Sequence, residues 1–305
     1  MGPHEMKDAD LIASMVTSAF QTGDIAVDTI SRLDELQREL DRVREELDVL
    51  RRRDDKLQFS MRRMDEELQL AARLQQDFLP KAMPRVGNVR FQTLFRPAAH
   101  VSGDLYDVMR LDEANVGFYM ADAVGHGMPA ALLSMFLKTA LVTKEINASG
   151  YRLLEPAQTM ARLNDALVEQ KLSHTTFATA LYGRVNIQTL ELTIARGGHP
   201  NPIIVKHDGS LRPIEADGPL LGIFPGETFE QATVRLEPGD RVFIYSDGIE
   251  WAFGDERTPD TSRWRENLLA WRAMPTEQLL GEFAQGVDRT QKKDDLTVIA
   301  IDVEA

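Results

Sequence analysis

Residues 97–133 read PAAHVSGDLYDVMRLDEANVGFYMADAVGHGMPAALL. This stretch contains strand-like runs, a glycine-containing turn and the start of a helical pattern. Asp104 and Asp122 each lie at the edge of an apolar, strand-like run. Asp122 also opens a turn that contains GHG (125–127) and leads into a helical pattern. Carboxylates at strand ends, beside backbone that can approach closely, are typical ligands of a hard divalent cation.

Two acidic turns far downstream extend this pattern. Asp247 ends an apolar run and precedes Gly248, while Asp294 and Asp295 immediately precede the run 296–301. Each residue alone has an ordinary explanation, because an Asp-Gly pair usually makes a turn and an Asp before a strand usually caps it. Together, apolar strands with acidic ends suit Mg²⁺ or Mn²⁺, and two such ions can promote in-line phosphoryl displacement.

The composition of the 305 residues is that of a globular protein, with 43% hydrophobic and 27% charged residues. A net charge of -13 argues against nucleic acid and anionic membranes as main partners, because both need a basic face. The lack of cysteine excludes disulfides, thiolate catalysis and zinc–thiolate sites. No apolar run approaches the roughly 18 residues of a membrane span, and no signal-peptide pattern is present. A cytoplasmic protein is the expectation.

A heptad pattern precedes the acidic region. Its apolar a and d positions alternate in spacings of three and four, with charged residues between them: Leu33, Leu36, Leu40, Val43, Leu47, Leu50, Leu57, Met61, Met64, Leu68, Ala71 and Phe78. The pattern predicts a coiled-coil helix over 31–79 and, as the simplest way to bury the stripe, a parallel homodimer through 33–78. One amphipathic helix lying on its own domain is the alternative. Asp54 and Gln75 occupy a positions and weaken the seam locally.

The rest of the chain divides into a short N-terminal segment and a large domain. Residues 1–30 predict one or two short helices, interrupted by Gly23. Pro80 and Pro84 end the long helix, so the large domain spans 80–305.

Within the large domain, short apolar and β-branched runs are separated by turns. They predict strands over 89–95, 116–120, 177–185, 190–195, 202–205, 233–236, 241–245 and 296–303. Helical patterns are predicted over 129–146, 156–169 and 276–288, with a weaker one over 260–273. Because strands cluster instead of alternating with helices, we expect an α+β fold: an antiparallel β-sandwich flanked by helices, preceded by the coiled-coil helix.

Six motifs occur in one order along the chain: PAAHVSGDLYD, ADAVGHGMPAALLSM, ARGGHPNPII, PLLGIF, LEPGDRVFIYSDGIEWA and KKDDLTVIAI. Together with LAARLQQDFLPKAMP (70–84), this set resembles the bacterial PPM-type serine/threonine phosphatases of the SpoIIE/RsbU group, over roughly residues 70–305. The resemblance implies the αββα fold of that group and two Mn²⁺ or Mg²⁺ ions. It also implies that Asp104 bridges the ions, that Asp122 and the backbone carbonyl of Ala123 hold the first, and that Asp247 and Asp294 hold the second. The nucleophile would be a metal-activated water.

Other residues at the site rank lower. Asp295 falls where the group often has a second polar residue, His126 is a polar or turn residue near the phosphate, and Gly248 follows a ligand. His199 is expected to be structural. The departures from the group's common residues are Ser102, Ala121 and Val124, and none of them removes a carboxylate.

The resemblance also implies a function. The usual substrate in this group is a phosphorylated STAS-domain protein, an anti-sigma factor antagonist, in a partner-switching pathway that controls a sigma factor. The coiled coil implies regulation by an upstream sensor or regulatory protein, and we hypothesise that helix pairing positions the predicted helix 129–146. A non-catalytic, phosphoprotein-binding scaffold and a hydrolase of small phosphate esters are the alternatives. The complete acidic set favours an enzyme over the scaffold.

Overall fold

The computed structural model describes residues 3–148, 150–172, 176–253, 263–289 and 294–304. The chain divides into two compact units, Met1–Glu66 and Glu67–Ala305. The boundary therefore falls before the predicted residue 80. The last turns of the long helix belong to the second unit because one face of them is buried there, with Gln75 only 2% exposed. No helix in the described ranges is long and apolar enough to cross a membrane.

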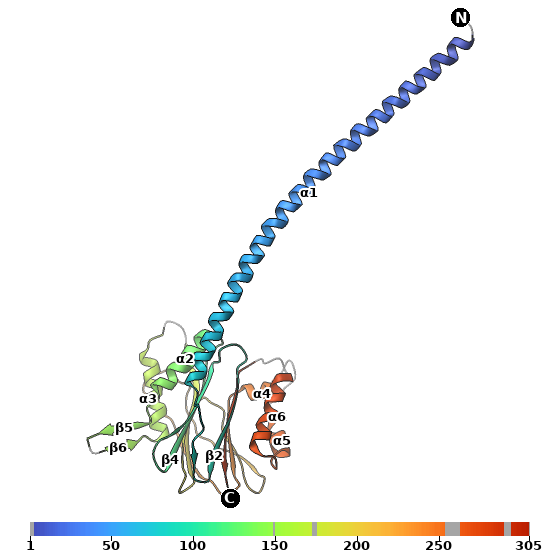
Figure 1. Ribbon diagram of the computed structural model, residues 1–305. Helices are drawn as coiled ribbons and strands as arrows, with labels where there is room; N and C mark the ends of the chain where they lie inside the picture. The colour runs from blue at the N-terminus through green and yellow to red at the C-terminus, as the bar shows by residue number, and fades with distance from the viewer. Residues whose placement is uncertain (1–2, 149, 173–175, 254–262, 290–293, 305) are drawn as a thin grey trace. The chain divides into compact units, whose positions relative to one another are not determined.

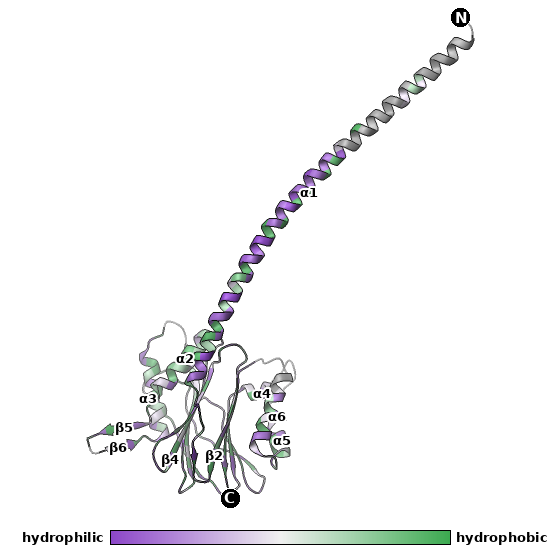
Figure 2. Cartoon of the chain, viewed as in Figure 1, coloured by the Kyte–Doolittle hydropathy of each residue, from purple (hydrophilic) through white to green (hydrophobic). Residues whose placement is uncertain are grey.

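Helix α1 (Pro3–Phe78) is continuous, so the prediction of a separate N-terminal helical segment interrupted by Gly23 is wrong. A glycine inside a helix costs only about 1 kcal/mol relative to alanine, which the helix-forming residues around it offset. Hydrophobic positions recur between hydrophilic ones along α1 (Figure 2). In the first unit, the a and d side chains from Leu33 to Met64 are all exposed, as an unpaired coiled-coil seam would be.

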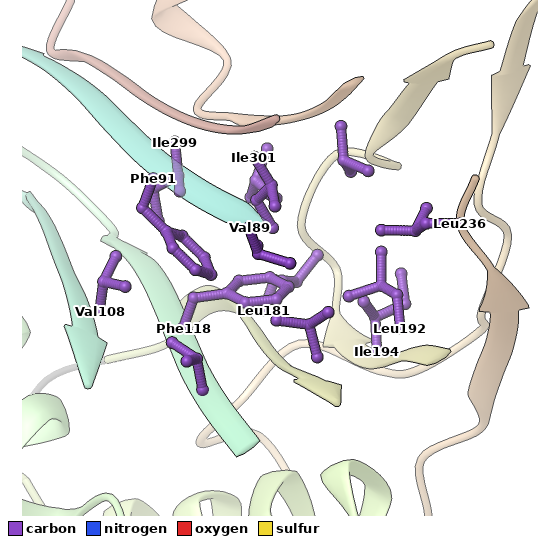
Figure 3. Packing of buried hydrophobic residues seen from close by; sticks show 14 of the residues in the cluster. Val89, Phe91, Val108, Phe118, Leu181, Leu192, Ile194, Leu236, Ile299 and Ile301 are labelled. Atoms are coloured by element: carbon purple, nitrogen blue, oxygen red, sulfur yellow. The ribbon is translucent and has the colours of Figure 1, made fainter. Parts of the chain in front are cut away.

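The second unit contains two antiparallel sheets packed face to face. One has the strand order β1 (Arg85–Val86), β2 (Val89–Arg96), β13 (Leu296–Val303), β12 (Arg241–Tyr245), β9 (Ile203–Val205) and β10 (Leu211–Pro213). The other has the order β11 (Gln231–Arg235), β8 (Glu191–Gly197), β7 (Ala178–Asn186), β4 (Asn115–Ala123) and β3 (Asp104–Arg110). Apolar side chains from both sheets, such as Phe91, Phe118 and Ile299, fill the space between them (Figure 3).

Helices cover the outer face of each sheet (Figure 1). The five-stranded sheet carries α2 (Met128–Ala140) and α3 (Pro156–Glu169), with Leu137 and Leu163 fully buried beneath them. The six-stranded sheet carries α4 (Gly248–Phe253), α5 (Arg263–Ala270) and α6 (Thr276–Arg289). This four-layer αββα arrangement confirms the predicted β-sandwich flanked by helices.

Two local predictions need correction. The predicted helix 129–146 ends at Ala140, because Leu141 turns to extended backbone (φ -68°, ψ 109°) and β-branched residues follow it. The hairpin of β5 (Lys144–Asn147) and β6 (Gly150–Leu153) takes its place. The weaker predicted helix 260–273 is observed over Arg263–Ala270, and its first residues lie outside the described ranges.

Candidate metal centre

Four carboxylates come to one end of the β-sandwich. On the five-stranded sheet, Asp104 begins β3 and lies directly opposite Asp122 of β4 in the strand register. On the six-stranded sheet, Asp247 follows β12 and Asp294 precedes β13, which is the antiparallel neighbour of β12. The two sheets are linked here because the Thr297 hydroxyl donates a hydrogen bond of 2.6 Å to Asp104 Oδ2. Residues 193 positions apart in the sequence are thus neighbours.

The charges of these carboxylates oppose one another. Burial raises the pKa of Asp104 well above its ordinary value, and the charge of Asp122 raises it further. Burial also raises the pKa of Asp122 to about 7, with the charges of Asp247 and Asp294 adding to the effect. The pKa of Asp294 rises to about 6 through burial and then through the charge of Asp247. The pKa of Asp247 is raised by loss of solvent and by Glu250.

This donor set fits a hard divalent cation. All the side-chain donors are carboxylate oxygens, which Mg²⁺ and Mn²⁺ prefer, and a cation among them would offset the repulsion that raises their pKa values. Within the described ranges, no three His, Asp or Glu side chains already converge as ligands around one point.

The backbone carbonyl of Ala123 lies beside the same space. Ala123 N donates to Gly103 O at 3.2 Å, and Gly103 has no side chain to fill the gap between them. A Cβ atom on Gly103 would lie 3.0 Å from Ala123 O and 3.6 Å from Asp122 Oδ1. Gly103 therefore keeps open the space beside two of the predicted ligand oxygens.

Asp295 has a different place from the other four acidic residues. Its Oδ1 accepts a hydrogen bond from Ala98 N and its Oδ2 accepts one from Gly103 N, both at 2.7 Å. Both amides belong to the crossover loop 97–103, which joins β2 of one sheet to β3 of the other. The Asp295 carboxylate is thus fully engaged in holding the loop that leads to Asp104.

The two remaining lower-ranked residues lie at the start of α4 and in the turn before α2. Gly248 begins α4 where the backbone of Asp295 approaches closely, since a Cβ atom on Gly248 would lie 2.0 Å from Asp295 O. His126 is exposed in the turn between β4 and α2, where Gly125 (φ 92°) and Gly127 (φ 73°) have left-handed backbone. Gly248 is therefore needed for close packing at the site.

Gln75, a weak point of the heptad seam, contacts the loop 97–103 directly. Gln75 Nε2 donates to Ser102 O at 2.6 Å, and Ser102 N donates to Gln75 Oε1 at 2.9 Å. The hydroxyl oxygen of Ser102 in turn accepts a hydrogen bond of 3.1 Å from Asp104 N. The signal that could have identified Gln75 is its polarity at an a position of the heptad pattern. The hydroxyls of Thr297 and Ser246 were missed because only the pairing of β12 with β13 places them beside Asp104.

A second link joins the end of α1 to the site through α2. Lys138 of α2 donates to the Phe78 carbonyl and forms a 3.0 Å ion pair with Asp107 Oδ2 of β3. Both side chains of the ion pair are less than one fifth exposed, so the pair is shielded from solvent. The last turn of α1 is therefore held both to the crossover loop and to α2.

Sequence comparison places this chain among characterised proteins. The family model described as "Stage II sporulation protein E (SpoIIE)" matches residues 112–304. Phosphoserine phosphatase RsbU of Bacillus subtilis (strain 168) is 28% identical over 239 residues, which cover 77% of this chain and 69% of RsbU. Phosphoserine phosphatase RsbP of the same organism is 24% identical, over 78% of this chain and 58% of RsbP. The chain thus spans little more than half of RsbP.

Structural comparison agrees with the sequence match. The SiaA-PP2C domain of Pseudomonas aeruginosa has a TM-score of 0.67 and 21% identity, over 79% of this chain and 97% of that one. RsbX, whose structure was determined in complex with magnesium, has a TM-score of 0.51 and 18% identity, over 72% and 98%. At these identities the solved structures establish only the shared fold. The match to the family model establishes membership of the family. The chain therefore belongs to the SpoIIE/RsbU group of bacterial PPM-type protein serine/threonine phosphatases.

Proposed function

We propose that this protein is a Mn²⁺- or Mg²⁺-dependent phosphatase that hydrolyses phosphoserine or phosphothreonine in a protein substrate. The observation that carries the proposal is the meeting of four carboxylates from two sheets, close enough to raise one another's pKa. Two divalent cations would convert this repulsion into binding. The ligand assignment follows the family: Asp104 shared by both ions, Asp122 with the Ala123 carbonyl for the first, and Asp247 with Asp294 for the second.

The residues around the ligands support phosphoryl transfer to water. When bound, the two ions would supply an activated water and would offset negative charge on the phosphoryl group. The hydrogen bond from Thr297 fixes the orientation of the Asp104 carboxylate, which is only 1% exposed. Asp247, in contrast, keeps contact with solvent although its neighbours partly desolvate it, so a phosphorylated segment can reach the centre from its side. The site is rigid on its buried side and open on the other.

We further propose a phosphorylated STAS-domain protein as the substrate, acting as an anti-sigma factor antagonist in a cytoplasmic partner-switching pathway. RsbU and RsbP carry the name phosphoserine phosphatase, which supports a phosphoprotein substrate. A non-catalytic phosphoprotein-binding scaffold would not need all four carboxylates at one end of the sandwich. The test below distinguishes a phosphoprotein substrate from a small phosphate ester.

Regulation through α1 is part of the proposal. The exposed stripe from Leu33 to Met64 supports a parallel homodimer or the binding of a sensor or regulatory protein. The predicted homodimer extended to residue 78, but Gln75 is buried within the second unit, so we restrict the dimer seam to 33–64. Gln75 and Lys138 connect the end of α1 to the loop before Asp104 and to α2.

The test is phosphate release from candidate phosphorylated STAS-domain proteins, with Mn²⁺, with Mg²⁺ and with a chelator. Asp247→Asn should abolish release, whereas Glu191→Gln, the same chemical change at the opposite end of the five-stranded sheet, should leave it unchanged. Activity in chelator, or full activity of Asp247→Asn, would overturn the mechanism. Release from p-nitrophenyl phosphate but from no phosphoprotein would favour the small-ester alternative.

A further inference from the structure

His199 is buried at the same end of the sandwich as the candidate metal centre, although it supplies no proposed ligand. It lies in the loop between β8 of one sheet and β9 of the other, and it is 0% exposed. Its Nδ1 is 2.9 Å from the hydroxyl oxygen of Thr179. Thr179 is the residue directly opposite Asp122 in the register of β4 and β7. A single hydrogen bond therefore joins the His199 ring to the strand beside a predicted ligand.

The other sheet also acts on the ring. Burial lowers the pKa of His199 to about 3, and the backbone of Tyr245 in β12 acts in the opposite direction, so that residue lies close to the imidazole. Tyr245 is two residues before Asp247. The ring is thus neutral, hydrogen-bonded to Thr179 of β7 and close to Tyr245, the last residue of β12. Among the described residues, none forms a hydrogen bond with His199 Nε2.

The loop that carries His199 is held in place by its own contacts. Arg196 Nη1 donates to His199 O at 2.7 Å, and Gly198 N donates to Gly218 O at 3.0 Å. Gly198 has a left-handed backbone (φ 66°), and a Cβ atom there would lie 2.4 Å from Leu220 Cδ2. The backbone has little freedom to move, so the position of the ring is fixed from behind.

We propose that His199 is a positioning residue for the metal centre: its buried ring holds Thr179 through a hydrogen bond, and the pairing of β7 with β4 passes this constraint to Asp122. This rests on the proposed metal centre. A histidine that only fills the core would also be buried. Such a histidine would not need a hydrogen bond to Thr179, the residue opposite Asp122, or a place close to Tyr245 at the end of β12. Groups that orient ligands in this way affect metal affinity without touching the ion.

The test measures Mn²⁺ binding by isothermal titration calorimetry on the full chain without substrate, together with the melting temperature. Thr179→Val removes the hydroxyl at nearly constant volume and should weaken Mn²⁺ binding about tenfold, as loss of an orienting group typically does. His199→Gln should have a similar effect, because its amide does not reach the Nδ1 position. Thr179→Ser and His199→Asn keep a polar atom at the shared contact, and both should bind Mn²⁺ within about threefold of the wild type.

Thr193→Val is the matched control. Thr193 is 7% exposed in the same sheet, and its hydroxyl pairs with that of Thr233 at 3.0 Å. It should lower the melting temperature as Thr179→Val does but leave Mn²⁺ affinity unchanged. The inference is overturned if Thr179→Val and His199→Gln bind Mn²⁺ like the wild type, even though they melt earlier. If the wild type itself binds no Mn²⁺, the proposed metal centre fails and this inference fails with it. If Asp247→Asn binds Mn²⁺ weakly but the Thr179 and His199 variants bind it normally, the metal centre stands and only the role of His199 is overturned.

Discussion

The side-chain amide of Gln75 forms two hydrogen bonds with the backbone of Ser102, one as donor and one as acceptor. Ser102 in turn contacts the amide of Asp104 through its hydroxyl oxygen. The side chain of Gln75 therefore joins helix α1, which carries the exposed heptad stripe, to the loop 97–103 that leads to the predicted metal ligand Asp104. This contact is more direct than the route through the helix after Asp122 that the sequence suggested.

Replacing Gln75 should uncouple the coil from the site. Gln75→Leu leaves the buried amide and carbonyl of Ser102 without partners, which costs about 1–3 kcal/mol of stability each when no water replaces the bond. We expect that removal of residues 1–66 changes phosphate release in the wild type but no longer does so in Gln75→Leu. Gln76→Leu, at the exposed neighbouring position, is the control and should behave like the wild type. An equal response to truncation in both variants would contradict the link.

Asp294 and Asp295 should respond oppositely to the same substitution. Asp295→Asn places an amide NH₂ against one of two backbone donors, so the free energy of unfolding should fall by about 1–3 kcal/mol. Asp294→Asn removes a charge that raises the pKa of Asp122 and should stabilise the protein in chelator. It should also weaken Mn²⁺ binding. Urea denaturation and calorimetry distinguish the two, and a destabilised Asp294→Asn would argue against this division of roles.

The glycine at the start of α4 should tolerate no side chain. A methyl group on Gly248 would lie 2.0 Å from Asp295 O, so Gly248→Ala must displace the backbone beside the site and should cost about 1–3 kcal/mol or more. Gly281→Ala in α6 is the matched control. Nothing lies within 4 Å of the added methyl group, and the substitution should stabilise the helix by about 0.5–1 kcal/mol. Thermal unfolding of the two variants should therefore shift in opposite directions.

His199 should make the protein sensitive to mild acid. Its folded pKa is about 3, against 6.5 in the unfolded chain, so the unfolded state binds more protons below pH 6.5. The free energy of unfolding should therefore fall as the pH drops from about 6.5 towards 3, by up to about 1.4 kcal/mol per pH unit. Carboxylates with raised pKa values act in the opposite direction, so the difference between wild type and His199→Asn isolates the ring. Denaturation curves at pH 7 and pH 5 in chelator provide the measurement, and parallel losses in both proteins would contradict it.

The exposed stripe of α1 should mediate self-association. Leu47 is 44% exposed at an a position, and Val49 is 49% exposed but lies off the stripe. Leu47→Asp places a charge in the seam and should shift the protein towards monomer in sedimentation velocity, while Val49→Asp should not. If the wild type is a monomer at all concentrations, or if both variants dissociate equally, the stripe is not a homodimer seam.

Local sequence patterns determined much of this protein. The heptad spacing predicted the long helix, and a helical pattern predicted the boundaries of α3 (Pro156–Glu169). Continuous apolar runs predicted β12 (Arg241–Tyr245) and β13 (Leu296–Val303), which are buried on both faces. The motif order identified the family and its acidic residues. Local patterning failed for the predicted helix 129–146, where apolar spacing continues past the helix end at Ala140 but residues from Lys144 onward form a hairpin.

Only the tertiary structure decided how the site residues divide their work. Asp294 and Asp295 are adjacent and chemically identical, yet only Asp295 is bound by two amides of a loop almost 200 residues away in sequence. In the sequence, Gln75 is only a polar residue at an a position of the heptad pattern. In the structure, it forms hydrogen bonds with Ser102 of the crossover loop. Hydrogen bonds depend on distances of a few tenths of an ångström, and the packing of two sheets sets those distances. A pattern of residue types along the chain does not contain that information.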